Sequence, residues 1–349
     1  MLALSPPELL ELLETLPADR TAFVWGPPGI GKSALVRAAA QDLGLPCVVL
    51  LGTQIAPEDL IGVPRIREVA TGRFATEFCP PGAILRSEPF LLFVDELNSA
   101  VPDVQKAFYS LILDRRLGDY ELPPGSRVVA AGNRIEDRAL VRPMATALAN
   151  RMVHVALEPN ADAWLRWAAG AAVHPLVLAF IRARPDRLCE TPPSDATPAY
   201  PTPRAWHMLA DTIANTSSRL WAALAAGSVG DRAGAEFAAF AQRALDAPTL
   251  EDVARGAAAV PRDPELIYFL GASCLARLAS GAKEDGELVA RVVIALGSVS
   301  KEVAVWTVDS ALSHPSSSPA VAAFQAVLRT SGAQTLVDVL RLSRYAREG

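Results

Sequence analysis

Short and nearly continuous apolar runs recur along the first part of the chain, separated by stretches with helical spacing. The runs cover 21–26, 47–52, 90–95, 126–133 and 151–157, and they are rich in Val, Leu, Ile or Phe. Strands buried on both faces have this near-continuous apolarity, because helices cover both sides of the sheet. The pattern therefore predicts an α/β fold with a parallel sheet over residues 1–158.

From about residue 159 the strand pattern ends, and Ala, Leu, Val and Arg recur at helical spacing. A Pro-rich stretch at 191–203 predicts a loop, because proline lacks the backbone donor that helices and central strands need. A second loop is expected at 313–319, and a last helical stretch at 335–347. We therefore expect a helical lid domain over 159–261 and a helical C-terminal extension over 262–349.

The segment GPPGIGKS, residues 26–33, follows the first predicted strand and opens a helix. It matches G-x-x-x-x-G-K-[ST], whose glycines let backbone N–H groups surround phosphate oxygens. In this motif the lysine, here Lys32, reaches the β- and γ-phosphates, and the hydroxyl of Ser33 holds Mg²⁺. The sequence thus predicts binding of ATP and Mg²⁺. The nucleotide-contacting residues are expected to be Gly26, Pro27, Pro28, Gly29, Ile30, Gly31, Lys32, Ser33, Ala34 and Asp95.

Two acids, Asp95 and Glu96, directly follow the apolar run LLFV. Open α/β sheets bind ligands at the carboxyl ends of their strands, and Asp95 lies 63 residues after Lys32 in the same predicted domain. We expect Asp95 to coordinate Mg²⁺ and Glu96 to orient and polarise the attacking water. Thr53 and Gln54 close the second strand, where a polar side chain would restrain Glu96 until a partner binds.

An amide ends the fourth predicted strand, SRVVAAGN. There the side chain of Asn133 would hold the lytic water against the γ-phosphate or, alternatively, only cap a turn.

In the helical region, Thr202 and Pro203 have the sequence of a helix N-cap and first helical position. Arg204 would then lie in the first turn of a helix and reach back toward the nucleotide.

Phosphoryl transfer needs positive charge on the terminal phosphate as it departs, and an arginine supplied across an interface can provide it. Arg151 lies between a predicted helix and the last predicted strand, where it would reach a neighbouring subunit. Arg134, Arg138 and Arg142 are alternatives for the same role. Each of these arginines is also compatible with an ordinary solvated surface charge.

The charge balance and the cysteines limit the choice of partners and location. The formal charge is −5, from 33 basic and 38 acidic residues, whereas nucleic-acid-binding domains usually carry a basic surface. We therefore expect no nucleic-acid partner.

The four cysteines have no C-x-x-C spacing, which predicts reduced thiols and a cytoplasmic location. We expect neither a signal peptide nor a membrane span.

Five motifs occur in the order that one ATPase family uses: GPPGIGKS, LLFVDELNSA, VVAAGN, ALANRM and TPRAW. Over about residues 1–215 the chain resembles an AAA+ ATPase of the MoxR type, in which these segments are Walker A, Walker B, sensor 1, the arginine finger and sensor 2. The resemblance implies a P-loop NTPase αβα sandwich, an all-helical lid, and a hexameric ring with nucleotide between subunits. It also implies that Arg151 acts in trans and Arg204 in cis.

Two further segments, 62–78 and 114–127, resemble the family's insertion in the second helix and its hairpin before sensor 1. The resemblance places them near the central pore or an adjacent face. Family members usually act as chaperone-like remodelling ATPases, often with a partner that carries a von Willebrand factor A domain. The function implied is therefore ATP-driven remodelling of a protein partner by a ring of this chain.

Two other functions fit part of the pattern. In a nucleotide-gated scaffold, ATP would stabilise assembly with little turnover, but the presence of both Glu96 and Asn133 favours hydrolysis. A DNA-directed AAA+ motor or loader is the second alternative, and the acidic balance of the chain disfavours it.

Overall fold

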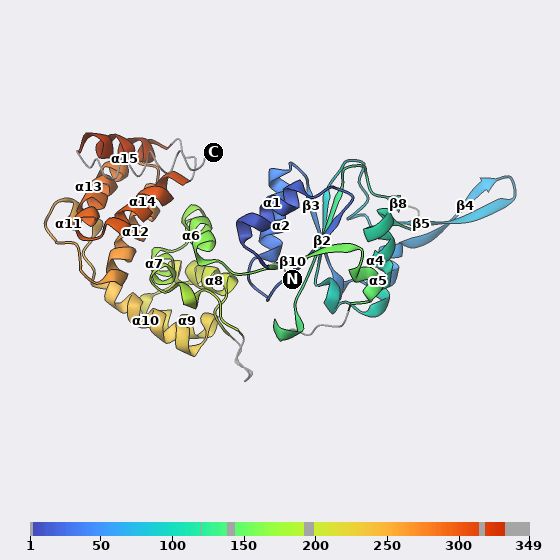
Figure 1. The fold of residues 1–349 in the computed structure, drawn as a ribbon, viewed down its shortest axis with the longest axis horizontal. Coiled ribbons are helices and arrows are strands. Elements are labelled where there is room, and N and C mark those ends of the chain that lie inside the picture. Colours follow the sequence, from blue (N-terminus) through green and yellow to red (C-terminus); the bar gives the residue numbers. More distant parts are fainter. Residues whose placement is uncertain (1–2, 119, 138–143, 192–198, 314–317, 332–349) are drawn as a thin grey trace. The chain divides into compact units, whose positions relative to one another are not determined.

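The computed structural model describes residues 3–118, 120–137, 144–191, 199–313 and 318–331 (Figure 1). The chain divides into two compact units, Met1–Pro159 and Asn160–Gly349. Each unit is described by itself. The predicted helix at 335–347 and two of the candidate arginines, Arg138 and Arg142, lie outside the described residues.

A parallel sheet forms the centre of the first unit. Its strands lie in the order β1-β10-β2-β9-β6-β3, and every pairing is parallel. Their bounds are Ala3–Leu4 (β1), Thr21–Trp25 (β2), Cys47–Leu51 (β3), Leu91–Asp95 (β6), Arg127–Gly132 (β9) and Met152–Leu157 (β10). The five predicted strands are confirmed, and only the two-residue β1 is an addition. Together with flanking helices this is a P-loop NTPase fold.

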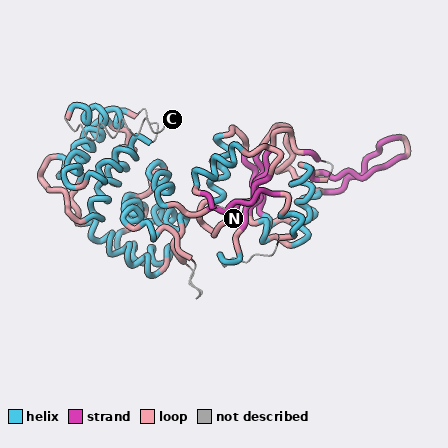
Figure 2. The backbone as a smooth tube through the Cα atoms, in the orientation of Figure 1, coloured by secondary structure: helices cyan, strands magenta, loops and turns pink. Residues whose placement is uncertain are grey.

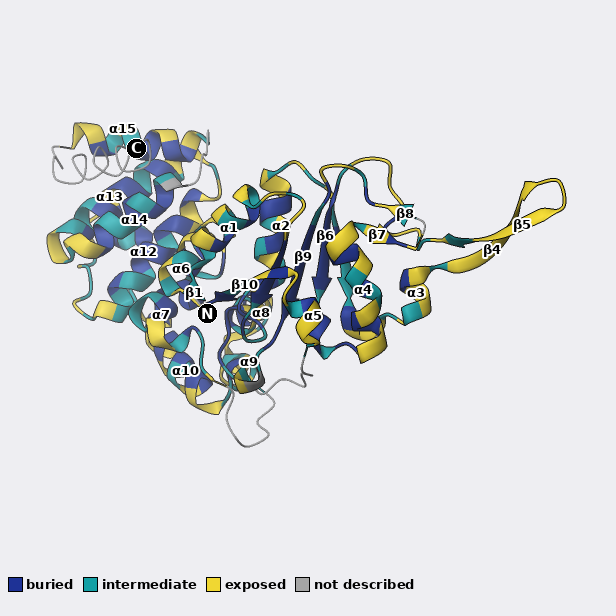
Figure 3. Ribbon diagram, turned by 45° about the vertical axis from the view of Figure 1, so that its right-hand side comes forward, coloured by how far each residue is buried: buried dark blue, intermediate teal, exposed yellow. Residues whose placement is uncertain are grey.

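Burial explains why these runs form inner strands. Ala22, Phe23 and Val24 in β2 are fully buried, as are residues 91–94 in β6 (Figure 3). Apolar side chains that alternate to both faces of a sheet are buried only if helices cover both faces. The polar residues of these segments are thereby confined to the strand ends.

Helices cover the two faces of the sheet in the first unit (Figure 1). On one side, α1 (Pro6–Thr15) packs on α2 (Lys32–Asp42), which in turn contacts β3 and β6. On the other, α4 (Pro102–Asp114) contacts α3 (Pro57–Ile61) and α5 (Thr146–Ala149). Val104, Phe108 and Leu111 of α4 share one hydrophobic core with Phe23 and Leu92 of the sheet.

A long antiparallel hairpin, β4 (Val63–Ala70) and β5 (Arg73–Cys79), extends away from the rest of the first unit (Figures 1 and 2). It occupies the segment 62–78 that the sequence singled out. The register pairs Ile66 with Thr76 and Arg65 with Glu77, so opposite residues share a face. Ile66 and Phe74 are 76% and 67% exposed. The hairpin therefore presents to solvent a face with two large apolar side chains, called here the apolar face, although it also carries Glu68 opposite Phe74.

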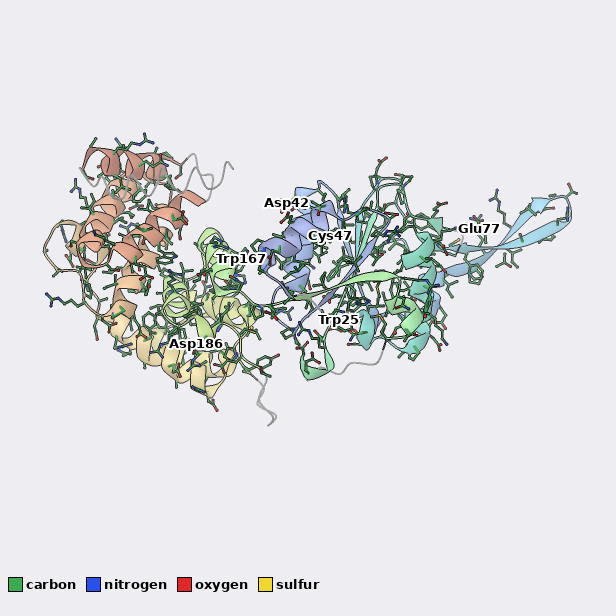
Figure 4. The ribbon with its side chains drawn as sticks, in the orientation of Figure 1. Trp25, Asp42, Cys47, Glu77, Trp167 and Asp186 are labelled. Atoms are coloured by element: carbon green, nitrogen blue, oxygen red, sulfur yellow. The ribbon has the colours of Figure 1, made fainter. Side chains whose placement is uncertain are left out.

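The opposite face of the hairpin is charged. It carries Arg65, Arg67 and Glu77, and Arg67 lies 3.9 Å from Glu77 in an exposed ion pair. Figure 4 shows Glu77 on this hairpin. A shorter hairpin, β7 (Arg116–Leu117) with β8 (Tyr120–Glu121), lies within the predicted segment 114–127. The hairpin expected before the fourth strand is thus present.

The second unit is helical throughout its described residues (Figure 2). Its helices are α6 (Ala161–Gly170), α7 (Pro175–Ala183), α8 (Pro203–Ala214), α9 (Trp221–Val229), α10 (Asp231–Leu245), α11 (Leu250–Ala254), α12 (Pro264–Leu278), α13 (Lys283–Val299), α14 (Lys301–Ser313) and α15 (Pro319–Thr330). One hydrophobic core runs from Trp164 to Leu328. Because this core crosses residue 261, the division into a lid and an extension stays a prediction.

The start of α8 is firmly held within the second unit. Thr202 Oγ1 accepts a hydrogen bond from the Ala205 amide at 3.0 Å, so Thr202 is the N-cap, as predicted. The buried Trp206 donates through Nε1 to the Arg187 carbonyl at 2.7 Å, and Arg187 pairs with Glu236 at 2.8 Å. These contacts fix the backbone that carries the exposed Arg204.

Every helix in the described residues is too short or too polar to cross a membrane.

Candidate functional site

Three neighbouring strands bring the predicted site residues to one edge of the sheet. The order β2-β9-β6 places β9 between the other two. The phosphate loop follows β2, Asn133 follows β9, and Asp95 and Glu96 stand at the end of β6. Because all three strands are parallel, their carboxyl ends share the edge where open α/β sheets bind ligands.

The phosphate loop has the backbone that its glycines predict. Gly29 and Gly31 have φ angles of 80° and 103°, a region that side chains disfavour. Gly31 is the N-cap of α2, so the helix begins at Lys32. The free N–H groups and the dipole at this end attract anions. The loop therefore combines a turn that can surround a phosphate with a helix that attracts one.

Lys32 lies inside this turn and is only 8% exposed. Its Nζ donates to the carbonyls of Gly26 at 2.5 Å and Pro27 at 3.0 Å, and to Asn133 Oδ1 at 2.9 Å. A buried ammonium needs such acceptors, because an unpaired buried charge is very unfavourable. The cation is thus held at the loop, next to the strand end that carries Asn133.

Ser33 and Asp95 meet across the site. Ser33 Oγ donates to Asp95 Oδ2 at 2.7 Å. A hydroxyl and a carboxylate oxygen are hard oxygen ligands of the kind that Mg²⁺ takes beside nucleotide phosphates. The two residues therefore fit a magnesium ion, as the sequence predicts.

Glu96 has an unusual backbone conformation, and its carboxylate already accepts a hydrogen bond. Its φ and ψ angles are 55° and 32°, a left-handed conformation that is uncommon outside glycine and often marks functional sites. Thr53 Oγ1 donates to Glu96 Oε2 at 2.9 Å, and the Glu96 amide donates to Asp95 Oδ1 at 3.0 Å. The contact with Thr53 is the one that the restraint hypothesis requires.

The arginines differ in their surroundings. Arg151 is exposed, donates to the Ala147 carbonyl, and stacks 5.3 Å from the ring of Tyr109. These contacts hold it against α4 and α5. Arg134 is partly buried and lies 3.9 Å from Glu136. Arg204 belongs to the second unit, so its role at the nucleotide stays a prediction.

Three hydrogen bonds at the site involve residues that the sequence did not predict as site residues. Trp25, at the end of β2 (Figure 4), donates through Nε1 to His154 Nδ1 at 2.9 Å, and His154 Nε2 lies 2.8 Å from the Ala149 carbonyl. This links the phosphate loop to the helix before Arg151. The buried Asn98 donates to the Asn133 carbonyl at 2.7 Å. The available signal for Asn98 was a polar residue two positions after the acid pair, in the turn that follows a buried strand.

Residues 21–152 match the model of one domain family, the AAA domain of the dynein-related subfamily. The FtsH ATP-dependent zinc metalloprotease of Mycoplasma genitalium is 27% identical over 161 residues, which are 39% of this chain and 21% of that protein. The proteasome-activating nucleotidase of Methanococcus vannielii is 25% identical over 156 residues, 41% of this chain and 35% of that protein. The chain thus spans about a fifth to a third of the length of these relatives.

Solved structures with a similar arrangement include RuvB of Thermotoga maritima, with a TM-score of 0.37 and 17% identity over 70% of this chain and 68% of that chain. A putative ATPase from Cytophaga hutchinsonii has a TM-score of 0.35 and 14% identity over 96% of this chain and 88% of that chain. The family and sequence matches support the AAA+ class for the nucleotide-binding unit.

Proposed function

We propose that this chain binds Mg-ATP at the carboxyl edge of its sheet and hydrolyses it. The observation that carries the proposal is the convergence of Lys32, the Ser33–Asp95 pair and Asn133 next to Glu96, on three adjacent strand ends. The match of residues 21–152 to an AAA domain supports it. So do the sequence relatives, which are an ATP-dependent protease and a nucleotidase.

The residues have distinct roles in this proposal. The amides of the phosphate loop and the ammonium of Lys32 bind the β- and γ-phosphates. Ser33 and Asp95 hold Mg²⁺, which supplies positive charge to the phosphate oxygens. Glu96 accepts a proton from the attacking water while Asn133 orients it. The water oxygen then bonds to the γ-phosphorus as the bond from that phosphorus to the β–γ bridging oxygen breaks.

The hydrogen bond from Thr53 implies a restraint on this reaction. Glu96 Oε2 accepts the Thr53 hydroxyl at 2.9 Å, so this carboxylate oxygen is engaged by Thr53 and is less available to an attacking water. Hydrolysis then requires that this bond break. Thr53 would therefore keep basal turnover low and release Glu96 when a partner moves the end of β3.

Assembly into a hexameric ring of the MoxR type completes the proposal. Arg151 is exposed and contacts the Ala147 carbonyl and the Tyr109 ring, and in the proposed ring it extends to the γ-phosphate bound by a neighbouring subunit. In this arrangement Arg151 acts in trans and Arg204 in cis. The remodelled target is a protein, and a von Willebrand factor A domain protein is the proposed partner. A cytoplasmic location belongs to the same proposal.

The exposed apolar face of the β4–β5 hairpin favours a protein target over DNA. Ile66 and Phe74 are largely exposed on it, whereas a nucleic-acid contact would need a basic surface. On the other face Arg67 is paired with Glu77. A scaffold with little turnover is the remaining alternative, and turnover measurements distinguish it from an ATPase.

Glu96→Gln tests the hydrolytic role directly. We expect the wild-type protein to hydrolyse ATP and to lose this activity when EDTA removes Mg²⁺. The substitution should lower turnover by about 10²–10³-fold, because the amide cannot accept the proton, while ATP affinity measured by fluorescence titration changes little. Glu88→Gln, an exposed carboxylate in the same unit, is the control and should be fully active. Equal turnover in wild type and Glu96→Gln would remove Glu96 from the mechanism.

Thr53→Val tests the restraint. Valine keeps the shape of threonine but cannot donate to Glu96, so basal turnover should rise by about two- to ten-fold, the range set by one net hydrogen bond. Thr53→Ser keeps the hydroxyl and should behave like the wild type. The readout is steady-state phosphate release without any partner. Unchanged or lower turnover in Thr53→Val would show that the bond does not restrain the reaction.

Arg151→Ala tests the ring. We expect the specific activity of the wild type to rise with protein concentration as oligomers form. The variant should assemble and bind ATP, but it should hydrolyse ATP at least about 10²-fold more slowly. Turnover and mass are measured together, with and without Mg-ATP. Arg134→Ala, the described alternative, should be close to wild type. A monomeric protein with activity independent of concentration would contradict the trans-acting arginine.

The hairpin face is tested with an unfolded protein. Wild-type protein with a non-hydrolysable ATP analogue should bind fluorescein-labelled casein. The Ile66→Ser/Phe74→Ser double variant should bind it about ten-fold or more weakly, because two large apolar contacts are lost. Basal ATP turnover should be unchanged. Arg65→Ser/Arg67→Ser alters the opposite face and is the control. Equal casein affinity in all three proteins would exclude the apolar face as the contact.

A further inference from the structure

Asn98 is a buried amide immediately beyond the acid pair. It lies in the 3-10 turn Leu97–Ser99 (η2), which starts from Glu96, and it is only 2% exposed. Its Nδ2 donates to the backbone carbonyl of Asn133 at 2.7 Å. The Asn98 side chain must face Asn133 with its NH₂ group, because a carbonyl oxygen can only accept a hydrogen bond. One side chain thus joins the turn after β6 to the end of β9.

The packing around this amide depends on the absence of a side chain at Gly132. A Cβ at position 132 would lie 2.1 Å from Asn98 Oδ1 and 2.7 Å from its Cγ. Such contacts are far inside van der Waals distance, so Asn98 and Gly132 fit one another only as this pair. The amide therefore lies directly against the backbone of β9, in space that a side chain at position 132 would occupy.

The same amide is unfavourable as a purely structural group. Asn98 Oδ1 is buried and has no hydrogen-bond partner among the described residues. A buried acceptor without a partner opposes folding, and an apolar side chain of the same shape would avoid that penalty. An amide at this position therefore needs an explanation beyond packing.

The neighbours of Asn98 supply that explanation. Behind it, the Ser99 amide donates to the Glu96 carbonyl at 3.0 Å, which closes the turn on Glu96. Ahead of it, Asn133 accepts from Asn98 through its backbone, and its Oδ1 accepts from Lys32 at 2.9 Å. Moving Asn98 would therefore displace Glu96 and Asn133 relative to one another.

We infer that Asn98 is a positioning residue: it fixes the separation between Glu96 and the Asn133 amide, and acts on hydrolysis through Asn133. The inference rests on the proposed ATPase function. Displacements of about 1 Å at reacting groups can cost about 10²-fold in rate. The effect belongs to turnover and not to ATP affinity, because Lys32 keeps its bonds to the Gly26 and Pro27 carbonyls without Asn98.

The first measurement compares kcat and KM for ATP in wild type, Asn98→Leu and Gln105→Leu. Gln105 is the matched control: it is 3% exposed, and its Nε2 donates to the Ala100 carbonyl at 3.1 Å. We expect Asn98→Leu to lower kcat by about ten-fold or more with KM nearly unchanged. Gln105→Leu should keep kcat. Thermal unfolding is followed in parallel, and Asn98→Ala replaces the leucine variant if that variant does not fold.

The second measurement is a double-mutant cycle with Asn133→Ala. If Asn98 acts through the Asn133 amide, Asn98→Leu should have no further effect on kcat in the Asn133→Ala background. Effects that multiply, or equal losses of kcat in Asn98→Leu and Gln105→Leu, would overturn the inference while the ATPase function stands. A wild-type protein that binds Mg-ATP without turnover would overturn the proposed function and this role together.

Discussion

Burial of the Lys32 ammonium is the constraint on which the rest of the site depends. Lys32 is only 8% exposed, and a buried charge is tolerated only with close acceptors. The acceptors come from two strands: the Gly26 and Pro27 carbonyls follow β2, and Asn133 Oδ1 follows β9. The cation therefore requires β2 and β9 to be neighbours, with their carboxyl ends level.

That pairing in turn sets the position of the acids. β9 lies between β2 and β6, so the end of β6 reaches the phosphate loop only across β9. Ser33 bridges to Asp95 on one side, and Asn98 bridges to Asn133 on the other. The segment after β6, which carries the two acids, is thus joined by one hydrogen bond to the start of α2 and by another to the end of β9. Hydrolytic geometry and sheet order are parts of the same arrangement.

The sequence predicts the local parts of this arrangement and not the contacts between them. The five longer strands of the sheet and the phosphate loop are predictable from the sequence, because apolar runs and the glycine pattern are local signals. The order of the strands, the bond from Asn98 to Asn133 and the ring contact of Arg151 with Tyr109 depend on pairings between distant segments. The segment 62–78 was recognised as an insertion, but its form as a hairpin was not predicted.

The restraint on Glu96 and the exposed hairpin belong to one continuous segment. β3 ends at Leu51, Gly52 packs against the Glu96 carbonyl so closely that a Cβ would lie 3.1 Å from it, and Thr53 then donates to the Glu96 carboxylate. The chain continues through α3 directly into β4. The hairpin is thus joined to the site at both of its ends, because β4 follows Thr53 and α3 while β5 leads along the chain into β6. Glu96 directly follows β6, so the hydrogen bond from Thr53 to Glu96 joins the segment that enters the hairpin to the segment that leaves it.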